Sequence, residues 1–192
     1  LRRSTLSFIN DMFNIQLGHP KINTIPKQEF ETVREVFLRL FRSPEESIFI
    51  FWNQIPLRFR YREDLYASFN DMLALVWLLQ KEKKGETTAK FQNQLLTLTL
   101  TCVWNKDDLS IQARFESFEY LYEPYGAALN NSSEIHLSKA AFLSEWKTLL
   151  HQIVVSLEAS KCIIKESVER RRLELLQLTE KSIENYGRLY IR

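Results

Sequence analysis

Three arginines form the most concentrated basic feature of the sequence, and they are its first candidates for chemistry. Arg58, Arg60 and Arg62 alternate with apolar residues, a pattern typical of an extended segment with its charges on one side. A row of guanidinium groups could form a rim that faces an anionic ligand or partner, or it could be a solvated surface. Pro56 lies just ahead of the row, so we expect these residues in a connection rather than inside a helix.

The histidines and cysteines, which could act as nucleophiles, redox groups or metal ligands, are each isolated in the sequence. The isolated candidates are His19, His136, His151, Cys102 and Cys162. The sequence contains no phosphate-binding glycine loop, nucleophile elbow, HExxH, CxxC pair or EF-hand loop. The acidic pairs Glu45–Glu46 and Asp107–Asp108 stand at expected helix starts, where the helix dipole accounts for them. We therefore predict no catalytic residue, no metal and no cofactor, and a binding module rather than an enzyme; an enzyme would need a pocket formed only in the fold.

The composition favours a helical protein inside the cell. Four glycines and five prolines among 192 residues indicate long regular elements, and 45% apolar residues supply a packed core. The formal charge of +2 gives no general argument for nucleic acid or an anionic membrane, so neither is predicted as a partner. With no signal peptide visible, the two cysteines are typical of buried or idle thiols in a reducing compartment, which predicts the cytoplasm or the nucleus.

One apolar stretch, Leu65–Leu79, is expected to form the helix on which the neighbouring segments pack. As a helix it is apolar almost all round, and Asp71 is its only ionic side chain. Such a helix must be enclosed by the rest of the domain. The stretch is too short to span a bilayer, so we expect the central helix of a soluble core.

Around this helix we expect a mainly α fold. Amphipathic helices are predicted for residues 1–17 and 27–42, and a short third helix for residues 43–55, although its apolar run could also be a buried strand. Residues 89–122 fit either two helices or a short β-hairpin within 95–118, because their apolar residues match both periods. We favour the helices, since they leave no exposed sheet edge.

The C-terminal part of the sequence predicts a long helix. Apolar residues recur at helical spacing over residues 133–192, which divides the chain into a helical head at 1–131 and a stalk at 132–192. A lone helix of this charged kind is only marginally stable in water, so we expect the start of a coiled coil with a partner chain. The expected seam residues are Ile164, Val168, Leu175 and Leu178.

Several segments within residues 1–84 occur in the order seen in one known family. A basic residue precedes a helix with the sequence of Ser7–Asp11, a phenylalanine-rich helix follows at Phe30–Phe41, Ile55–Pro56 forms a break, and a hydrophobic helix ends in Leu73–Leu79. These segments resemble the divergent calponin-homology head of the Hec-type large subunit of the outer-kinetochore rod complex, or a related head of that superfamily.

The resemblance implies a calponin-homology-like head on a coiled-coil stalk, a sister subunit as its partner, and binding to tubulin in microtubules at a kinetochore. The basic side chains that would meet the acidic tubulin surface are Arg2, Arg3, Lys81, Lys83 and Lys84. Arg58, Arg60 and Arg62 are added to these candidates because of their charge density alone, and not because of the resemblance. The alternative is a helical scaffold or adaptor that binds a partner protein through an apolar face, such as Phe49–Trp52, or through the C-terminal seam.

Overall fold

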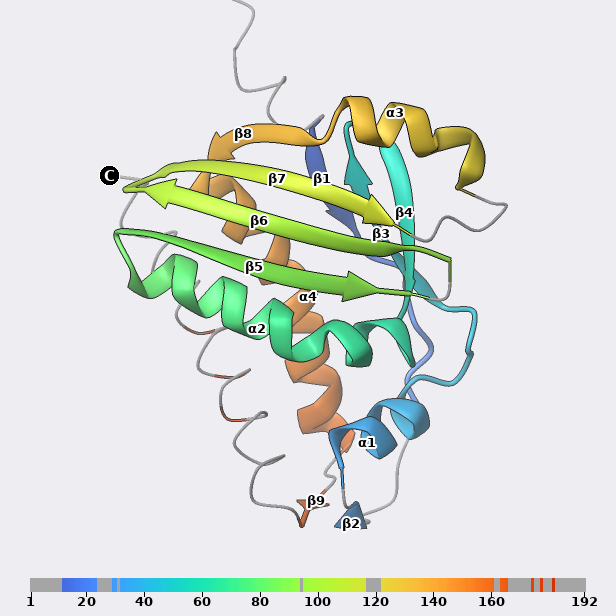
Figure 1. The fold of residues 1–192 in the computed structure, drawn as a ribbon. Helices are drawn as coiled ribbons and strands as arrows, with labels where there is room; N and C mark the ends of the chain where they lie inside the picture. The colour runs from blue at the N-terminus through green and yellow to red at the C-terminus, as the bar shows by residue number, and fades with distance from the viewer. Residues whose placement is uncertain are drawn as a thin grey trace, which may run out of the picture.

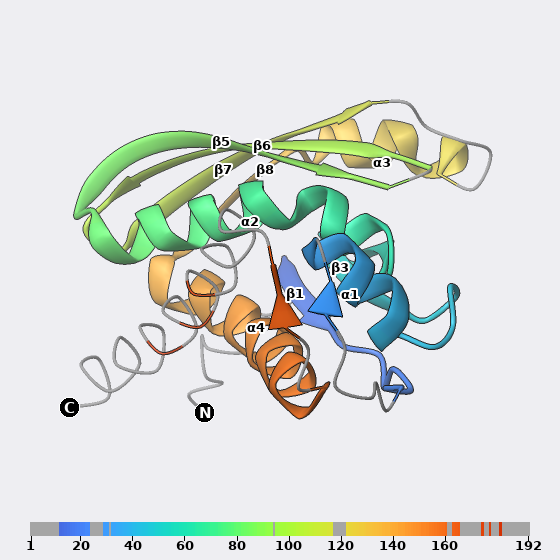
Figure 2. The same cartoon turned by 90° about the horizontal axis from the view of Figure 1, so that it is seen from below.

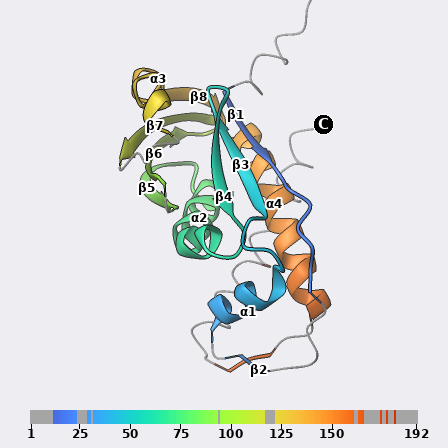
Figure 3. The ribbon, with the colours of Figure 1, turned by 90° about the vertical axis from the view of Figure 1, so that its right-hand side faces the viewer.

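The structure is a computed structural model, and it describes residues 12–23, 29–30, 32–93, 95–116, 122–160 and 163–165, together with positions 174, 177 and 181. In this part of the chain strands are as prominent as helices, so the expected mainly α fold is wrong and the fold is mixed α/β. A four-stranded sheet covers one long helix, and a three-stranded sheet stands between that helix and a second one (Figures 1 and 3).

The two larger sheets are antiparallel throughout, and the two-stranded sheet is parallel. The three-stranded sheet has the order β1 (Phe13–Gln16), β3 (Ser47–Trp52), β4 (Ile55–Arg60). The four-stranded sheet has the order β5 (Lys84–Gln92), β6 (Thr97–Asn105), β7 (Asp108–Glu116), β8 (Glu134–Ser138). The parallel pair is β2 (Glu29–Phe30) and β9 (Ile163–Ile164). The helices are α1 (Val33–Leu40), α2 (Asp64–Lys81), α3 (Gly126–Asn131) and α4 (Lys139–Ser160), with a 3-10 turn at Glu123–Tyr125.

The apolar run ahead of Pro56 is a strand, and the helix expected for residues 43–55 is wrong. β3 and β4 form a hairpin in which Trp52 is paired with Ile55. The two turn residues, Asn53 and Gln54, have φ of 46° and 69°, the left-handed values that a two-residue hairpin turn needs. A short apolar run has no period that separates strand from helix, so the turn decides its structure.

Residues 97–116 also form a hairpin, and the two helices favoured for this region are wrong. The buried residues of β6 are Leu98, Leu100, Cys102 and Trp104, which alternate with more exposed ones. At the turn, Lys106 has a φ of 58°, and its backbone N–H donates to the Lys83 carbonyl at 2.6 Å. This bond ties the β6–β7 turn to the start of β5.

The central apolar stretch is a helix, as its sequence predicts. α2 runs beneath the four-stranded sheet and buries Leu65, Phe69 and Met72 (Figure 2). It is not enclosed all round, because Ala74 is exposed and Trp77 is only half-buried, with the Lys81 ammonium 4.7 Å from its ring centroid. One stripe of the helix therefore remains at the surface, where the Lys81 cation lies against the indole.

The single long helix expected for residues 133–192 is wrong, and so is its coiled coil, although residues 139–160 and the described positions 174, 177 and 181 are helical. Residues 134–138 form β8, α4 ends at Ser160, and residues 163–164 pair with β2. Ile164 of the expected seam therefore lies in a strand pair, whereas Val168, Leu175 and Leu178 lie outside the described residues. The expected boundary at residue 131 falls between two strands of one sheet. None of the described helices is both long enough and apolar enough to cross a membrane.

The structure near the N-terminus also contains less helix than the sequence predicts. Residues 13–16, inside the helix predicted for 1–17, form the strand β1, and residues 1–11 lie outside the described part. The helix predicted to start at residue 27 starts at Val33. There the Thr32 hydroxyl accepts from the backbone N–H of Glu35 at 3.3 Å and caps α1.

Aromatic rings join both sheets to α4. The ring centroids of Phe13 on β1 and Phe142 on α4 are 4.8 Å apart, and those of Phe91 on β5 and Trp146 on α4 are 5.5 Å apart. These contacts place α4 and the three-stranded sheet under one face of the four-stranded sheet, which we call its inner face. The opposite, outer face carries exposed side chains such as Val103.

Candidate functional site

Side chains close the edge of the three-stranded sheet at β4. The outward backbone N–H of Arg58 donates to the Tyr122 hydroxyl at 2.7 Å, and that of Arg60 donates to the Asp64 carboxylate at 2.8 Å. The third outward position is Pro56, which has no N–H, and proline is tolerated at such an edge. These three positions offer no free donor to another strand.

Glu145 of α4 occupies one of the outward donors at β1. The backbone N–H of Ile15 donates to Glu145 Oε2 at 2.9 Å. Partial burial raises the pKa of the Glu145 carboxyl group, and the hydrogen bond from Ile15 opposes that rise in part. The ionised carboxylate is therefore less favourable in the folded chain than in the unfolded chain.

We expect Glu145→Gln to remove a pH-dependent loss of stability. A carboxyl group with a higher pKa in the folded state binds protons on folding, so this residue makes the wild type less stable as pH rises from the ordinary carboxyl pKa through the raised one. Glutamine keeps an oxygen for the Ile15 N–H but does not titrate. Urea denaturation from about pH 4 to about pH 8 should show a stability difference that moves in favour of the variant as pH rises. A difference that stays constant with pH would contradict this role.

Two side chains of α2 close half of the edge at β5. Asp71 Oδ2 accepts from the backbone N–H of Lys90 at 2.7 Å, and Ser68 Oγ accepts from that of Gln92 at 3.1 Å. The bond from Lys90 explains why Asp71, an ionic residue, lies within the apolar stretch Leu65–Leu79. Nearer the start of β5, the outward N–H groups of Lys84, Glu86 and Thr88 have no such acceptor among the described residues.

The ladder between β7 and β8 shows which backbone groups of β8 point outward. At one end of the ladder the backbone N–H of Ala113 donates to the Ser133 carbonyl at 2.7 Å. Bonded and non-bonded pairs alternate along an antiparallel ladder. The odd-numbered residues of β8 therefore bond to β7, and Glu134 and His136 direct their N–H and C=O groups away from it.

These outward groups form a bare strand edge. Among the described residues, no hydrogen bond reaches the backbone N–H or C=O groups of Glu134 and His136 on this side. Both residues are exposed, and β8 is the outermost strand of its sheet, opposite β5 (Figure 1). We call the outward backbone groups of Glu134 and His136 the β8 edge. Free donors and acceptors at a sheet edge can pair with another strand.

A shallow, open hollow lies on the outer face next to the β8 edge. Its volume is about 810 Å³, and residues from all four strands line it. Lys84, Glu86, Ser110 and His136 surround Val103, whose side chain is 48% exposed. An open hollow of this kind suits a segment of protein better than a small ligand, which needs an enclosed pocket.

Three side chains at this hollow are of types found in hydrolase active sites, but their geometry is not that of a nucleophilic triad. Glu134 Oε1 lies 3.1 Å from His136 Nε2 and accepts from the Ser110 hydroxyl at 3.4 Å. In a triad the imidazole contacts the serine and the acid orients the imidazole, whereas here the carboxylate lies between the two. The described residues also contain no cluster of three or more His, Cys, Asp and Glu side chains that could hold a metal ion.

Acidic neighbours compensate the arginines of the expected anionic rim. Arg58 Nη2 lies 2.7 Å from Glu45 Oε2, and Arg60 Nη2 lies 2.6 Å from Glu63 Oε2. Arg62 is half-buried, and its Nε has no hydrogen-bond partner among the residues that the structure describes. Because the two charges on β4 are already paired, the structure gives no support to an anion-binding row.

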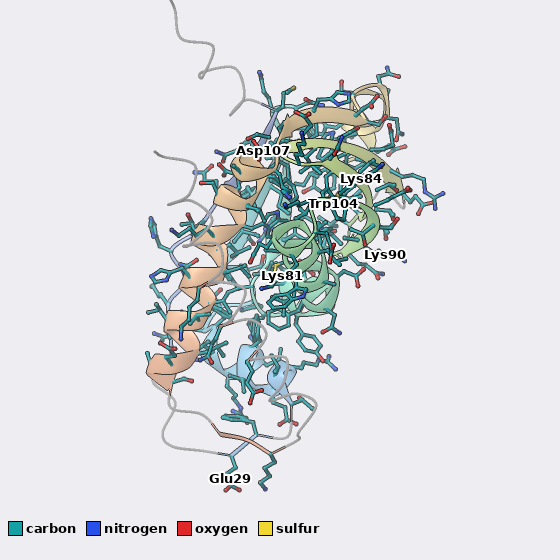
Figure 4. All side chains as sticks on the ribbon, turned by 90° about the vertical axis from the view of Figure 1, so that its left-hand side faces the viewer. Glu29, Lys81, Lys84, Lys90, Trp104 and Asp107 are labelled. Carbon is teal, nitrogen blue, oxygen red and sulfur yellow. The ribbon has the colours of Figure 1, made fainter. Side chains whose placement is uncertain are left out.

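The lysines implied by the resemblance lie at one corner, where α2 meets β5. Lys81, Lys83 and Lys84 are exposed there, and Figure 4 labels the first and last of them. The Lys106 turn adjoins them through its bond to the Lys83 carbonyl. Exposed Glu82, Glu86 and Asp108 give the corner a mixed charge. Arg2 and Arg3 lie outside the described residues. Microtubule binding through these side chains stays a prediction, while the all-helical head expected with it is contradicted.

Asp107 does serve a helix start, but it is the start of α4, more than 30 residues further along the chain, which no local pattern connects with Asp107. Asp107 Oδ1 accepts from the backbone N–H of Ala140 at 3.0 Å, and the Ser138 hydroxyl accepts from that of Ala141 at 3.0 Å (Figure 4). The buried Lys139 ammonium donates to the Glu82 carbonyl at 3.1 Å, and burial lowers its pKa. These contacts fix the start of α4 against the end of α2.

Cys102 is an idle thiol, as its isolation in the sequence predicts. It is fully buried on β6, and burial raises the pKa of its thiol to about 12. Cys162 lies outside the described residues.

Sequence reasoning missed the β8 edge, although a signal for it was present. Polar and apolar residues alternate from Glu134 to Ser138, which is the period of a half-buried strand. The prediction of a long helix from residue 133 concealed this alternation. Comparisons of the chain with protein-family models, with curated proteins and with solved structures give no match, so its function must be argued from this geometry.

Proposed function

We propose that the chain is a protein-interaction module that accepts an extended segment of a partner protein as an additional strand along the β8 edge. One observation carries the proposal: the outward backbone groups of Glu134 and His136, both exposed residues, receive no hydrogen bond from the described part of the chain, whereas side chains occupy outward donors at β1, β4 and the second half of β5. In strand addition, main-chain hydrogen bonds supply affinity and the pockets for alternate side chains supply specificity.

Both faces beside β8 have surfaces that such side chains can contact. A strand added there directs alternate residues to the outer face, next to His136 and the hollow, and the others to the inner face. On the inner face Leu137 packs on the core but is only partly buried. An apolar residue of the partner would cover it and gain from the burial. We therefore expect a partner segment that alternates polar and apolar residues.

This proposal keeps the class of function that the sequence predicts, a module that binds a partner protein, but it moves the binding surface. The apolar face expected at Phe49–Trp52 is largely used by the fold, because Trp52 is fully buried and Phe49 is 36% exposed. We propose the β8 edge in place of that apolar face, because the unbonded groups of the edge are backbone N–H and C=O groups, which can bond to another strand.

The variant His136→Pro tests the proposal. Proline at this position removes one outward N–H and leaves the ladder with β7 intact, because His136 belongs to a non-bonded pair. Its matched control is Thr88→Pro, which removes an outward N–H from the opposite edge of the same sheet at an exposed residue that does not line the hollow. Peptides selected on the wild type from a displayed random library should bind Thr88→Pro unchanged and should lose affinity about tenfold or more for His136→Pro.

A second measurement keeps the test independent of how well the proline variant folds. In the wild type, amide hydrogen exchange of Glu134 and His136 should slow when a selected peptide is added, because their N–H groups become bonded. Peptides that bind without protecting these two amides, or that lose affinity equally for both proline variants, would contradict the proposal.

A further inference from the structure

We propose that the β8 edge also binds a second copy of the same chain, which joins two four-stranded sheets across a two-fold axis. This inference rests on the proposed function, because it uses the same unbonded backbone groups. A two-fold axis requires each copy to present the same patch to the other, so the edge must be complementary to itself. The residues of the edge meet that condition in one register.

Backbone geometry leaves few registers to choose from. In an antiparallel pair the outward groups of Glu134 and His136 must face outward groups of the other copy. A two-fold axis can then pass through residue 134, 135, 136 or 137, and the axis at residue 137 pairs His136 with Ser138 but leaves Glu134 without a partner. With the axis at Ile135, Glu134 of each copy lies opposite His136 of the other, and each of these two pairs exchanges two backbone hydrogen bonds.

The side-chain charges select the axis at Ile135. An axis at Glu134 places two carboxylates directly opposite each other, and an axis at His136 does the same with two imidazoles. Unlike groups opposite one another stabilise a strand pair, and like charges destabilise it. Only the register centred on Ile135 brings a carboxylate and an imidazole together at both positions, and these two side chains already attract each other within one chain at 3.1 Å.

The ends of the strand limit the length of the pairing. The next outward carbonyl belongs to Ser132, and it already accepts from Trp52 Nε1 at 2.8 Å and from Asn53 Nδ2 at 2.7 Å. The shared ladder is therefore confined to residues 134–136. On the inner face the axis brings the Ile135 side chains of the two copies together, and it places each Leu137 beside Ser133 of the other copy. A short ladder of this kind predicts a weak dimer with a dissociation constant of about micromolar.

Sedimentation equilibrium of the full chain tests the inference through a charge exchange. Glu134→Lys places a cation opposite His136 of the second copy and should weaken the dimer about tenfold or more. The double variant Glu134→Lys with His136→Glu restores opposite charges in the register centred on Ile135 and should return the dissociation constant to within about threefold of the wild type. Glu86→Lys makes the same charge change at the opposite edge and should leave the dimer unchanged.

Several results would overturn the inference without touching the proposed function. A wild type that stays monomeric up to about 100 times the expected dissociation constant would do so, even where selected peptides still protect the Glu134 and His136 amides. A dimer that Glu134→Lys leaves intact, or that the double variant does not restore, or that Glu86→Lys weakens, would place the contact elsewhere. Conversely, a dimer that follows the charge exchange while no peptide binds would leave the second copy as the edge's occupant and overturn the broader proposal.

Discussion

Trp146→Ala is expected to destabilise the fold by about 3–5 kcal/mol, the usual cost of truncating a buried aromatic side chain. Trp146 is 1% exposed, and its ring lies 5.5 Å from Phe91 and 6.0 Å from Phe142, centroid to centroid. It therefore fills the space between α4 and the four-stranded sheet. Because the whole stability of a domain is about 5–15 kcal/mol, the variant should be marginally folded, which urea denaturation followed by circular dichroism will measure.

Trp146→Phe is the control that separates ring packing from polar burial. The indole Nε1 of Trp146 is buried and has no hydrogen-bond partner in the described part of the chain, and an unpaired buried donor costs about 1–3 kcal/mol. Phenylalanine leaves a smaller void than alanine and removes that donor. We therefore expect Trp146→Phe to cost less than half as much as Trp146→Ala. Equal costs for the two variants would indicate that the indole N–H is bonded after all.

Gly85→Ala is expected to cost about 1–3 kcal/mol, because the added methyl group has no space. A Cβ at this position would lie 2.5 Å from Trp104 Cζ2, well inside the normal separation of two carbon atoms. The Trp104 ring is held in place, since it is 3% exposed and its Nε1 donates to the Glu82 carbonyl at 2.9 Å. Thermal and urea denaturation will give the change in the free energy of unfolding.

A double-mutant cycle with Trp104→Phe identifies the cause of that cost. Phenylalanine is too short to carry an atom at the position of Trp104 Cζ2, so Gly85→Ala should cost less in the Trp104→Phe background, with a coupling of about 1 kcal/mol or more. Gly85 does not have a positive φ, so backbone strain is not an alternative source of the effect. Additive costs for the two substitutions would contradict the steric explanation.

The sequence predicts α2 because that helix is long. Its apolar residues repeat over many turns, and no strand of that length fits a small domain. The shorter elements could not be assigned in the same way. Phe91, Leu98 and Cys102 sit at helical spacing by coincidence, although they belong to two neighbouring strands. The Asn53–Gln54 turn lacks the glycine that usually signals a two-residue hairpin, so β3 was mistaken for a helix.

The candidate site was less predictable than the fold. Whether a strand edge is free depends on side chains that can come from distant parts of the sequence. Tyr122 bonds to Arg58 across 64 residues, and Glu145 bonds to Ile15 across 130 residues. A local sequence pattern cannot predict hydrogen bonds between residues so far apart in the chain. It therefore could not show that the outward groups of β8 receive no such bond from the described residues. The alternation from Glu134 to Ser138 predicts a strand, but its bare edge follows only from the arrangement of the whole sheet.

The order of synthesis gives the bond between Ile15 and Glu145 a further meaning. Ribosomes add about 5–20 residues per second, so a nascent β1 exists for several seconds before α4 has been translated. During that interval the Phe13 ring lacks Phe142 and the Ile15 N–H lacks its acceptor. The three strands of this sheet can thus pair early, but the outward N–H of Ile15 gains its acceptor only after translation has passed residue 145.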